Sequence, residues 1–454
     1  MKKITLLIAM ITFSSANSQS IAGGYEYTLF TCGNGTVTAT GDNSTGQLGN
    51  GTTTNTLTPI AISGLTNVIA VSTKDAFSLF LKSDGTVWAC GTNSFGQFGN
   101  GTTTNSKVPV KIPSLTGIIK IAAGYDHSLF LKNDGTVWSC GRNGLGQLGN
   151  GNITQQNTPV QVIGVTNIVD IAAGIEHSIF LAADGTVKAC GSNSSGNLGI
   201  GNSSAQATPA TVSITNVAAI AAGFNHSVFL KQDGTVWACG NNFFGQLGDG
   251  TTDSKNIPVQ ANNLTGITSI ATGQYHSLFV KDNGTAWCVG DNNRGQLGDG
   301  TQIGKSSAVQ VSNLTDVKSV FESGYSNSLF AKNDGTIYIS GANNGAFGNS
   351  VTTNSSVPVL VTTNCQALSI DENTINHSVS IYPNPSKGIF NIQTQQPLEN
   401  ASVKVSDLNG RIIHNLKVEN SENKSLDLNH LQNGIYILTI KNENYNYSQK
   451  IIKQ

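Results

Sequence analysis

A segment of about 50 residues recurs seven times along this chain, and its period constrains the fold more than any other feature of the sequence. The third copy, residues 121–151, places Asp134-Gly135 between two apolar runs with alternating side chains. Asp-Gly between such runs predicts a β-hairpin, because the tight turn needs a positive φ that glycine adopts freely. The turn glycine stands in every copy, as Gly35, Gly85, Gly135, Gly185, Gly234, Gly284 and Gly335.

Seven copies of this length, each made of strand-forming segments, predict an all-β fold with four-stranded blades around an axis. A single blade cannot bury both of its faces, whereas a closed ring of blades can. We therefore expect a seven-bladed β-propeller over residues 19–363. The last copy ends in a strand-like run, residues 357–361. We expect this run to complete a blade with the N-terminal strand, since both would otherwise be exposed edge strands.

Each copy also carries a longer motif. In the third copy it reads Ile-Ala-Ala-Gly-x-x-His-Ser-Leu-Phe-Leu, then Asp-Gly-Thr-Val-Trp-x-x-Gly-x-Asn-x-x-Gly-Gln-Leu-Gly. This pattern resembles the regulator of chromosome condensation repeat, over about residues 22–363. The resemblance implies a seven-bladed propeller. Secreted bacterial inhibitors of β-lactamase are members of this family, and their likeness implies that a ring of aromatic loop residues contacts a partner.

The two ends of the chain carry predicted targeting segments. Residues 1–18 combine a basic start, a short apolar core and small residues before Gln19, which predicts a secretory signal peptide. The apolar core is too short to span a bilayer, so we expect no transmembrane anchor. The repeat is followed by a polar segment, residues 364–378, which we interpret as a linker.

Residues 379–454 contain short alternating segments that predict a small C-terminal β-sandwich. They include Tyr-Pro-Asn-Pro-x-x-Gly-x-Phe, Asp-x-x-Gly, Gly-Ile-Tyr and a terminal Lys-Ile-Ile-Lys. These elements resemble the type A sorting domain of type IX secretion. The resemblance implies recognition by the type IX machinery, export through the periplasm of a Gram-negative bacterium, and release or attachment at the cell surface. The motif residues are Tyr382, Pro383, Asn384, Pro385, Gly388, Gly410, Gly434 and Tyr436.

Composition and motifs exclude several functions. The net charge is −1 and no basic block is present, which argues against nucleic acid as a partner. The sequence contains no Gly-x-Ser-x-Gly, His-Glu-x-x-His or P-loop. A catalytic site would break the symmetry of the repeat with a cluster of unusual polar residues, and we identify none. We therefore predict a protein that is not an enzyme and holds no cofactor.

Histidines recur at one position of the repeat, as His127, His177, His226 and His276. Equivalent positions on successive blades fan out around the axis, whereas metal ligands must converge on one ion. We therefore predict no metal site. We expect each of these histidines to bond the backbone near it.

The seven cysteines divide into two groups. Five lie at or next to one strand position of the repeat, where we expect buried free thiols: Cys90, Cys140, Cys190, Cys239 and Cys288. Cys32 lies in the first copy and Cys365 lies just beyond the last. A disulfide between them would lock the ring, and the sequence leaves open whether they pair.

The two residues between the repeat glycine and the repeat histidine differ from copy to copy. One repeat position maps to one ring on one face of a propeller, and this ring mixes aromatics with acids, as interface hot spots do. A second variable set lies in the glycine-rich loops. The candidate binding residues are Tyr25, Asp75, Tyr125, Ile175, Phe224, Tyr275, Tyr325, Phe95, Phe243 and Phe244. The alternative is that the aromatic side chains fill the central channel.

We predict a secreted or cell-surface propeller that acts as a non-catalytic protein-binding module. A glycan-binding adhesin and a passive structural module of the cell surface remain as alternatives, with an unknown protein or a surface glycan as partner. A hydrolase with a site in the channel is the third possibility.

Overall fold

A computed structural model of the chain describes residues 20–363, 365, 379–398, 400–407, 412–418, 421–441 and 446–454. The chain divides into two compact units, residues 1–365 and 366–454. Across the described residues every named element is a β-strand, and no helix is long and apolar enough to cross a membrane. The predicted signal peptide and nearly all of the predicted linker lie outside the described residues.

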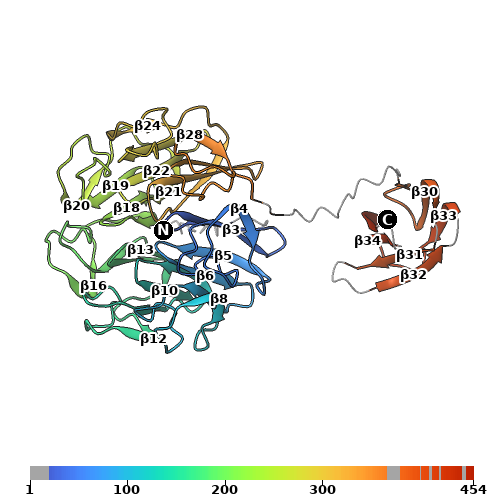
Figure 1. Ribbon diagram of the computed structural model, residues 1–454, viewed down its shortest axis with the longest axis horizontal. Helices are drawn as coiled ribbons and strands as arrows, with labels where there is room; N and C mark the ends of the chain where they lie inside the picture. The colour runs from blue at the N-terminus through green and yellow to red at the C-terminus, as the bar shows by residue number, and fades with distance from the viewer. Residues whose placement is uncertain are drawn as a thin grey trace, which may run out of the picture. The chain divides into compact units, whose positions relative to one another are not determined.

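The first unit consists of seven four-stranded antiparallel sheets, each built from four strands that are consecutive in the sequence (Figure 1). The first three blades are β1 (Ile21–Gly23), β2 (Tyr27–Thr31), β3 (Val37–Gly41) and β4 (Thr56–Ala61); β5 (Val68–Thr73), β6 (Phe77–Lys82), β7 (Val87–Gly91) and β8 (Ser106–Lys111); and β9 (Ile118–Ala123), β10 (His127–Lys132), β11 (Val137–Gly141) and β12 (Gln156–Gln161).

The next two blades are β13 (Ile168–Ala173), β14 (His177–Ala182), β15 (Val187–Gly191) and β16 (Gln206–Thr211); and β17 (Val217–Ala222), β18 (His226–Lys231), β19 (Val236–Gly240) and β20 (Lys255–Gln260). The last two are β21 (Ile267–Thr272), β22 (His276–Lys281), β23 (Ala286–Gly290) and β24 (Lys305–Gln310); and β25 (Val317–Phe321), β26 (Asn327–Lys332), β27 (Ile337–Gly341) and β28 (Ser355–Leu360). The first strand of each blade contacts the first strands of both neighbouring blades, so these seven strands surround the axis. The predicted seven-bladed propeller is confirmed.

Apolar cores lie between neighbouring blades. Between the second and third blades, Phe77 and Leu79 of β6 pack with Ile121 of β9 and Phe130 of β10. Successive side chains of a strand point to opposite faces of its sheet, so one blade supplies apolar groups to two such cores. A blade is therefore stabilised mainly by its two neighbours, which a closed ring provides for every copy.

The ring closes without exchanging a strand between its ends. Strand β28 pairs with β27 in the seventh blade and β1 pairs with β2 in the first, so the expected pairing of the C-terminal run with the N-terminal strand is wrong. Each of the seven copies already completes its own blade, and no strand is missing. Six of the seven outermost strands carry a proline at their fourth residue, which lacks an N–H to pair with a further strand. These residues are Pro59, Pro109, Pro159, Pro209, Pro258 and Pro358.

Other contacts join the first and seventh blades. The backbone N–H of Gly23 donates to the carbonyl oxygen of Glu322 at 3.0 Å, and the Thr28 hydroxyl donates to that of Ala346 at 2.9 Å. An apolar cluster that includes Phe30 and Leu329 lies between the two blades.

A disulfide between Cys32 and Cys365 spans the same boundary, with a Cα–Cα distance of 5.2 Å. This is the pair that the sequence left open. The five cysteines of the repeat are free and buried, as predicted.

The antiparallel path gives the propeller two different faces. The turns from first to second strand and the long loops from third to fourth strand lie at one face, which we call the loop face. The hairpin turns between second and third strands lie at the other, which we call the hairpin face. Ser20 immediately precedes β1 and Cys365 follows β28, so both chain connections leave the propeller at the hairpin face.

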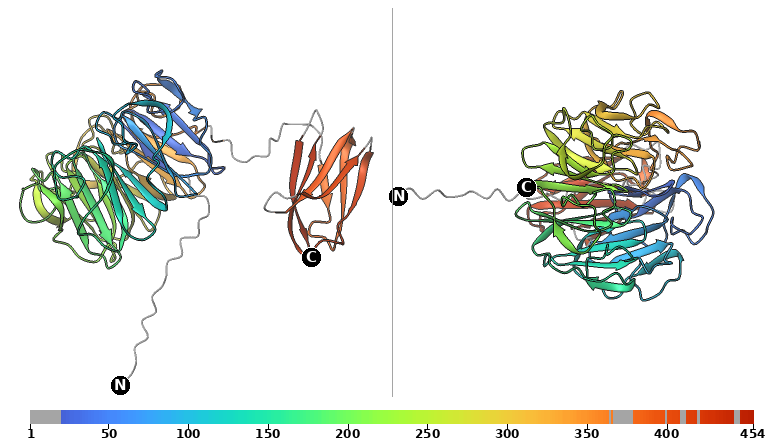
Figure 2. Two further views of the ribbon diagram at one scale, coloured as in Figure 1. Left: turned by 90° about the horizontal axis from the view of Figure 1, so that it is seen from below. Right: turned by 90° about the vertical axis from the view of Figure 1, so that its left-hand side faces the viewer.

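The C-terminal unit contains two sheets (Figure 2). One has the order β29 (Val379–Tyr382), β30 (Ile389–Leu398) and β33 (Ser421–Asp427); the other has the order β32 (Ile412–Val418), β31 (Ala401–Ser406), β34 (Gly434–Lys441) and β35 (Asn446–Lys453). Apolar side chains from both sheets, such as Phe390 and Leu438, form a single core. Two sheets around one core is the arrangement of a small sandwich.

Several residues of the sorting motif have structural roles in this unit. The Asn384 side-chain amide donates to the carbonyl oxygen of Lys450 and accepts from the N–H of Ile452, both at 2.8 Å, so the Pro-Asn-Pro segment holds the edge of β35. The Tyr436 hydroxyl donates to the carbonyl oxygen of Gln432 at 2.7 Å. Gly410 lies outside the described residues.

Candidate functional site

The turns between first and second strands bring the variable residues together at the centre of the loop face. Backbone hydrogen bonds of 3.1–3.3 Å link neighbouring turns: Tyr25 N to Asp75 O, Ile175 N to Phe224 O, Phe224 N to Gln274 O, and Gln274 N to Tyr325 O. These bonds run from blade to blade. They join the turn of the first blade to that of the second, and the turns of the fourth to seventh blades to one another.

The aromatic side chains of this ring form two groups. The rings of Tyr25 and Tyr325 contact each other at a tilt of 59°, with centroids 4.6 Å apart. The second group is a chain of contacts at distances typical of aromatic pairs. Its centroid separations are 6.3 Å for Tyr125–Phe224, 5.7 Å for Phe224–Tyr275, 5.2 Å for Tyr275–Phe244 and 5.1 Å for Phe244–Phe243.

Exposure divides the aromatic residues by role. Phe224 is buried, with 6% of its surface exposed, and so fills the centre of the face. Phe243 is 73% exposed and Tyr25 is 39% exposed. Tyr125, Ile175, Tyr275, Tyr325, Phe95 and Phe244 are half-buried. The aromatic contacts thus extend from a packed centre to solvent, so packing at the centre accounts for Phe224, and Phe243 and Tyr25 remain candidates for binding.

Carboxylates lie among these rings. The Tyr125 hydroxyl donates to the Asp75 carboxylate. Burial raises the pKa of Asp75 to about 6, and the negative charge of Asp126 adds to that shift. Arg142 lies 3.5 Å from carboxylate oxygens of both Asp126 and Glu176, with its guanidinium 5.2 Å from the centroid of the Phe95 ring. The loop face therefore combines aromatic surface with negative charge.

A fully buried lysine, which sequence reasoning missed, lies at the axis beneath this ring. The Lys74 ammonium donates to the backbone carbonyl oxygens of Ala173, at 2.9 Å, and Ala222, and it lies 3.9 Å from the Glu322 carboxylate. Burial lowers the pKa of Lys74, and Glu322 opposes that shift. The signal was present in the sequence, because Lys74 replaces the glycine that the other six copies carry at this position: Gly24, Gly124, Gly174, Gly223, Gly273 and Gly324.

The repeat histidines link neighbouring blades. Each Nε2 lies 2.9–3.2 Å from a serine hydroxyl of the next blade, in the pairs His127–Ser178, His177–Ser227, His226–Ser277 and His276–Ser328. The Ser178 hydroxyl donates to the carbonyl oxygen of Gln147, so His127 Nε2 is the donor in its own pair. The expected hydrogen bond between each histidine and the backbone near it is therefore wrong, because the imidazole bonds a serine of the next blade instead. Among the described residues, no group of three or more His, Cys, Asp or Glu could hold a metal ion.

The glycine position and the histidine position depend on each other. A Cβ added at Gly124 would lie 2.2 Å from Cε1 of His127, so the imidazole occupies the space that a side chain there would need. In the second copy Lys74 stands in place of the glycine and Phe77 in place of the histidine. Lys74 therefore does not meet a repeat histidine in its own copy.

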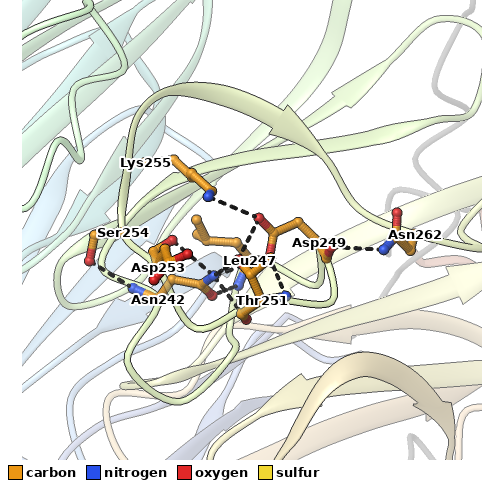
Figure 3. A network of polar contacts seen from close by, with 8 residues as sticks. All are labelled: Asn242, Leu247, Asp249, Thr251, Asp253, Ser254, Lys255 and Asn262. Carbon is orange, nitrogen blue, oxygen red and sulfur yellow. Dashed lines mark hydrogen bonds and ion pairs between the residues drawn. The ribbon is translucent and has the colours of Figure 1, made fainter.

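Each long loop is held by an asparagine at its base, and Figure 3 shows the one in the fifth blade. In the fifth blade the Asn242 amide nitrogen donates to Asp249 Oδ1 at 3.1 Å and to the carbonyl oxygens of Thr251, at 3.1 Å, and Asp253, at 3.2 Å. Its oxygen accepts from the N–H of Leu247 at 3.0 Å. One side chain thereby fixes the loop that presents Phe243 and Phe244.

Family models match most of the chain. A model described as RCC1-like domain matches residues 5–268, and one described as Regulator of chromosome condensation (RCC1) repeat matches residues 267–296. A model described as Secretion system C-terminal sorting domain matches residues 380–454. A search of curated proteins gives no match.

Solved structures with the same fold include human WBSCR16, with a TM-score of 0.61 and 25% identity over 68% of this chain and 86% of that one. Prp20p from Saccharomyces cerevisiae has a TM-score of 0.64 and 25% identity over 78% of this chain and 88% of its own. Yeast RCC1 (Prp20) bound to Kap60 has a TM-score of 0.65 at 22% identity, covering 78% of this chain and 85% of that chain.

Proposed function

This chain belongs to the RCC1-like domain family, and on that premise we propose that the loop face of its propeller binds a partner protein without catalysing a reaction. The observation that carries the proposal is the aromatic surface of the loop face. Phe243 and Tyr25 expose large rings there, and exposed aromatics held by a rigid scaffold are typical of interface hot spots. The yeast relative Prp20p is described by its binding to Gsp1p and histones, which supports protein binding by a propeller of this family.

The position of the chain connections supports the same face. Ser20 and Cys365, the described residues at the two ends of the propeller, both lie at the hairpin face, away from Phe243 and Tyr25. The C-terminal sorting domain makes this a secreted or cell-surface protein. We propose that it is exported through the periplasm of a Gram-negative bacterium.

The direct test is affinity capture from culture medium and outer-membrane extract with the full chain as bait. We expect a partner protein to be retained by the wild type and lost by the combined Tyr25→Ala and Phe243→Ala variant. Both residues are exposed, so their removal is expected to change stability by less than about 0.5 kcal/mol. Phe224 is unsuitable for this test, because it is buried and its truncation would disturb the fold.

The matched control removes exposed apolar side chains from the opposite end of the blades. Ile69 and Ile119 are 52% and 55% exposed and lie near the hairpin face, so the Ile69→Ala and Ile119→Ala variant removes apolar surface without touching the loop face. Retention of the same proteins by all three baits would contradict the proposal and favour a passive structural module. Release of the captured partner by soluble sugar would favour the glycan-binding alternative.

A further inference from the structure

Two carboxylates of the loop face have no cationic partner among the described residues. Glu26 and Asp75 lie in neighbouring turns, which the hydrogen bond from Tyr25 N to Asp75 O joins, and both act electrostatically on Tyr25, whose ring contacts that of Tyr325. The ion pairs of the described part of the chain involve neither carboxylate. Carboxylates and tyrosine rings that lie close together attract a cation in two ways, the carboxylates through their charge and the rings through their quadrupole.

Arg142 shows how a cation binds on this face. Its guanidinium pairs with Asp126 and Glu176 and lies over the Phe95 ring, so it combines two carboxylates with one aromatic ring. Asp126 and Glu176 occupy the same repeat position as Glu26. The second, third and fourth copies together thus contain a complete arrangement of acids, aromatic ring and cation.

The other side of the ring has the acids and the aromatic rings without the cation. The residues equivalent to Arg142 in the first, second and seventh copies are Asp42, Thr92 and Ala342. The backbone N–H of each donates to its own turn, as that of Arg142 does, so all of them lie beside the turn ring. None of the three is basic.

We propose that the partner supplies the missing cation, as an arginine or lysine side chain that binds between Glu26 and Asp75 against the rings of Tyr25 and Tyr325. This inference rests on the proposed function and names the chemistry of the partner. Arginine suits the position better than lysine, because its planar guanidinium bonds two carboxylate oxygens at once and stacks on aromatic rings.

Charge at the centre of the loop face favours the same occupant. The two variable turn residues of the seven copies include four acids and no base, the acids being Glu26, Asp75, Asp126 and Glu176. Lysines gather instead near the hairpin face, where they lie over tryptophan rings: Lys82 over Trp88, Lys132 over Trp138, Lys231 over Trp237 and Lys281 over Trp287. A basic segment of a partner therefore meets complementary charge at the centre of the loop face, whereas at the hairpin face lysines stand beside the aspartates of the hairpin turns, as in the pairs Lys132–Asp134 and Lys332–Asp334.

The experiment measures binding of a fluorescent Gly-Ser peptide that carries several arginines, by anisotropy, to the full chain at low ionic strength. Its counterpart carries citrulline, which has the shape of arginine without the charge. We expect the arginine peptide to bind at least about tenfold more tightly than the citrulline peptide. The Glu26→Gln and Asp75→Asn variant should bind the arginine peptide at least about fivefold more weakly than the wild type does. Added salt should also weaken the binding of the arginine peptide to the wild type.

The control variant, Asp84→Asn with Asp184→Asn, removes the same charge from the hairpin face. Asparagine is already native to that repeat position in two copies, as Asn34 and Asn283, so the control is expected to fold normally. Equal binding of the two peptides, or an equal loss in the control variant, would overturn the inference.

The same variants separate this inference from the proposed function. Suppose that the Tyr25→Ala and Phe243→Ala variant loses the captured partner and the Glu26→Gln and Asp75→Asn variant keeps it. Protein binding by the loop face would then stand, and the proposed basic side chain of the partner would be refuted. If both variants keep it, both proposals fall.

Discussion

Lys74, in the second blade, donates a hydrogen bond to the backbone carbonyl oxygen of Ala173, in the fourth blade, over 2.9 Å. The same ammonium group also bonds Ala222 in the fifth blade and lies 3.9 Å from Glu322 in the seventh. One side chain therefore connects four blades across the axis. These contacts help to hold a ring that lacks a shared strand between its ends.

Replacing Lys74 with methionine should destabilise the propeller. Methionine has a similar volume, but it leaves the carbonyl oxygens of Ala173 and Ala222 without this donor and Glu322 without its cation. We expect a loss of about 2–4 kcal/mol in the free energy of unfolding. Urea unfolding followed by tryptophan fluorescence measures it, because all four tryptophans lie in the propeller. Lys120→Met is the control, since Lys120 forms an exposed ion pair and should change stability by less than about 1 kcal/mol. Equal effects of the two substitutions would refute the role of Lys74.

The buried histidines should make the propeller sensitive to acid. Burial lowers the pKa of His127 and His226 to about 3 and that of His276 to about 4, and it lowers that of His177 well below its usual value. The unfolded chain takes up these protons near pH 6.5, so stability present above pH 6.5 is lost as the pH falls. At pH 5 the loss is about 2 kcal/mol for each histidine, from about 1.5 pH units at 1.36 kcal/mol each.

The carboxyl group of Asp75 has the opposite effect on stability as the pH falls. Its pKa is raised to about 6, so it contributes about 1.4 kcal/mol of added stability between pH 7 and pH 5. Four histidines outweigh this single carboxyl group, and unfolding at pH 7.5 and pH 5 should show a large net loss. His226→Asn, which introduces the residue that the seventh copy carries as Asn327, should reduce that loss by about 2 kcal/mol. A stability that does not change over this range would contradict the prediction.

The disulfide should stabilise the closed ring. Cys32 and Cys365 are 333 residues apart in the sequence, and a cross-link over so long a loop restricts the unfolded chain strongly. Replacing both cysteines with serine should cost roughly 2–5 kcal/mol. Thermal unfolding with and without a reductant checks the cause, because reduction should lower the melting temperature of the wild type and leave that of the variant unchanged. A reductant that lowers both equally would point to another cause.

Phe224 and Phe243 should respond differently to truncation. Phe224→Ala leaves a cavity at the centre of the loop face and should cost about 3–5 kcal/mol. Phe243→Ala removes a ring that is 73% exposed and should change stability by less than about 0.5 kcal/mol. Similar losses for the two variants, measured by urea unfolding, would mean that Phe243 is also a packing residue.

The sequence predicts the blades well because the signals for a hairpin are local. Asp134 and Gly135 specify a turn within their own copy, and the period then counts the blades. The closure of the ring depends on contacts between the ends of the propeller, so residues 357–361 gave no local signal of their pairing. The serine partner of each repeat histidine is about 50 residues away, in the next copy, and is likewise set by packing.

The candidate site is harder to predict, because burial is decided in three dimensions. Phe224 and Phe243 are the same residue type in variable segments of one copy, yet only the folded ring buries one and exposes the other. Lys74 stands where the other six copies have glycine, and the carbonyl groups that it bonds lie 99 and 148 residues away. A comparison of the seven copies at each position would have identified Lys74, but not the blades to which it reaches.

The central proposal is that the loop face binds a protein, and site-specific photo-crosslinking tests it most directly. A photoreactive phenylalanine analogue is placed at Phe243, on the loop face, or at Ile119, near the hairpin face, and the full chain is irradiated with outer-membrane extract and culture medium. We predict a discrete protein adduct from position 243 and none from position 119. Adducts of the same proteins from both positions, or no adduct from position 243, would contradict the proposal.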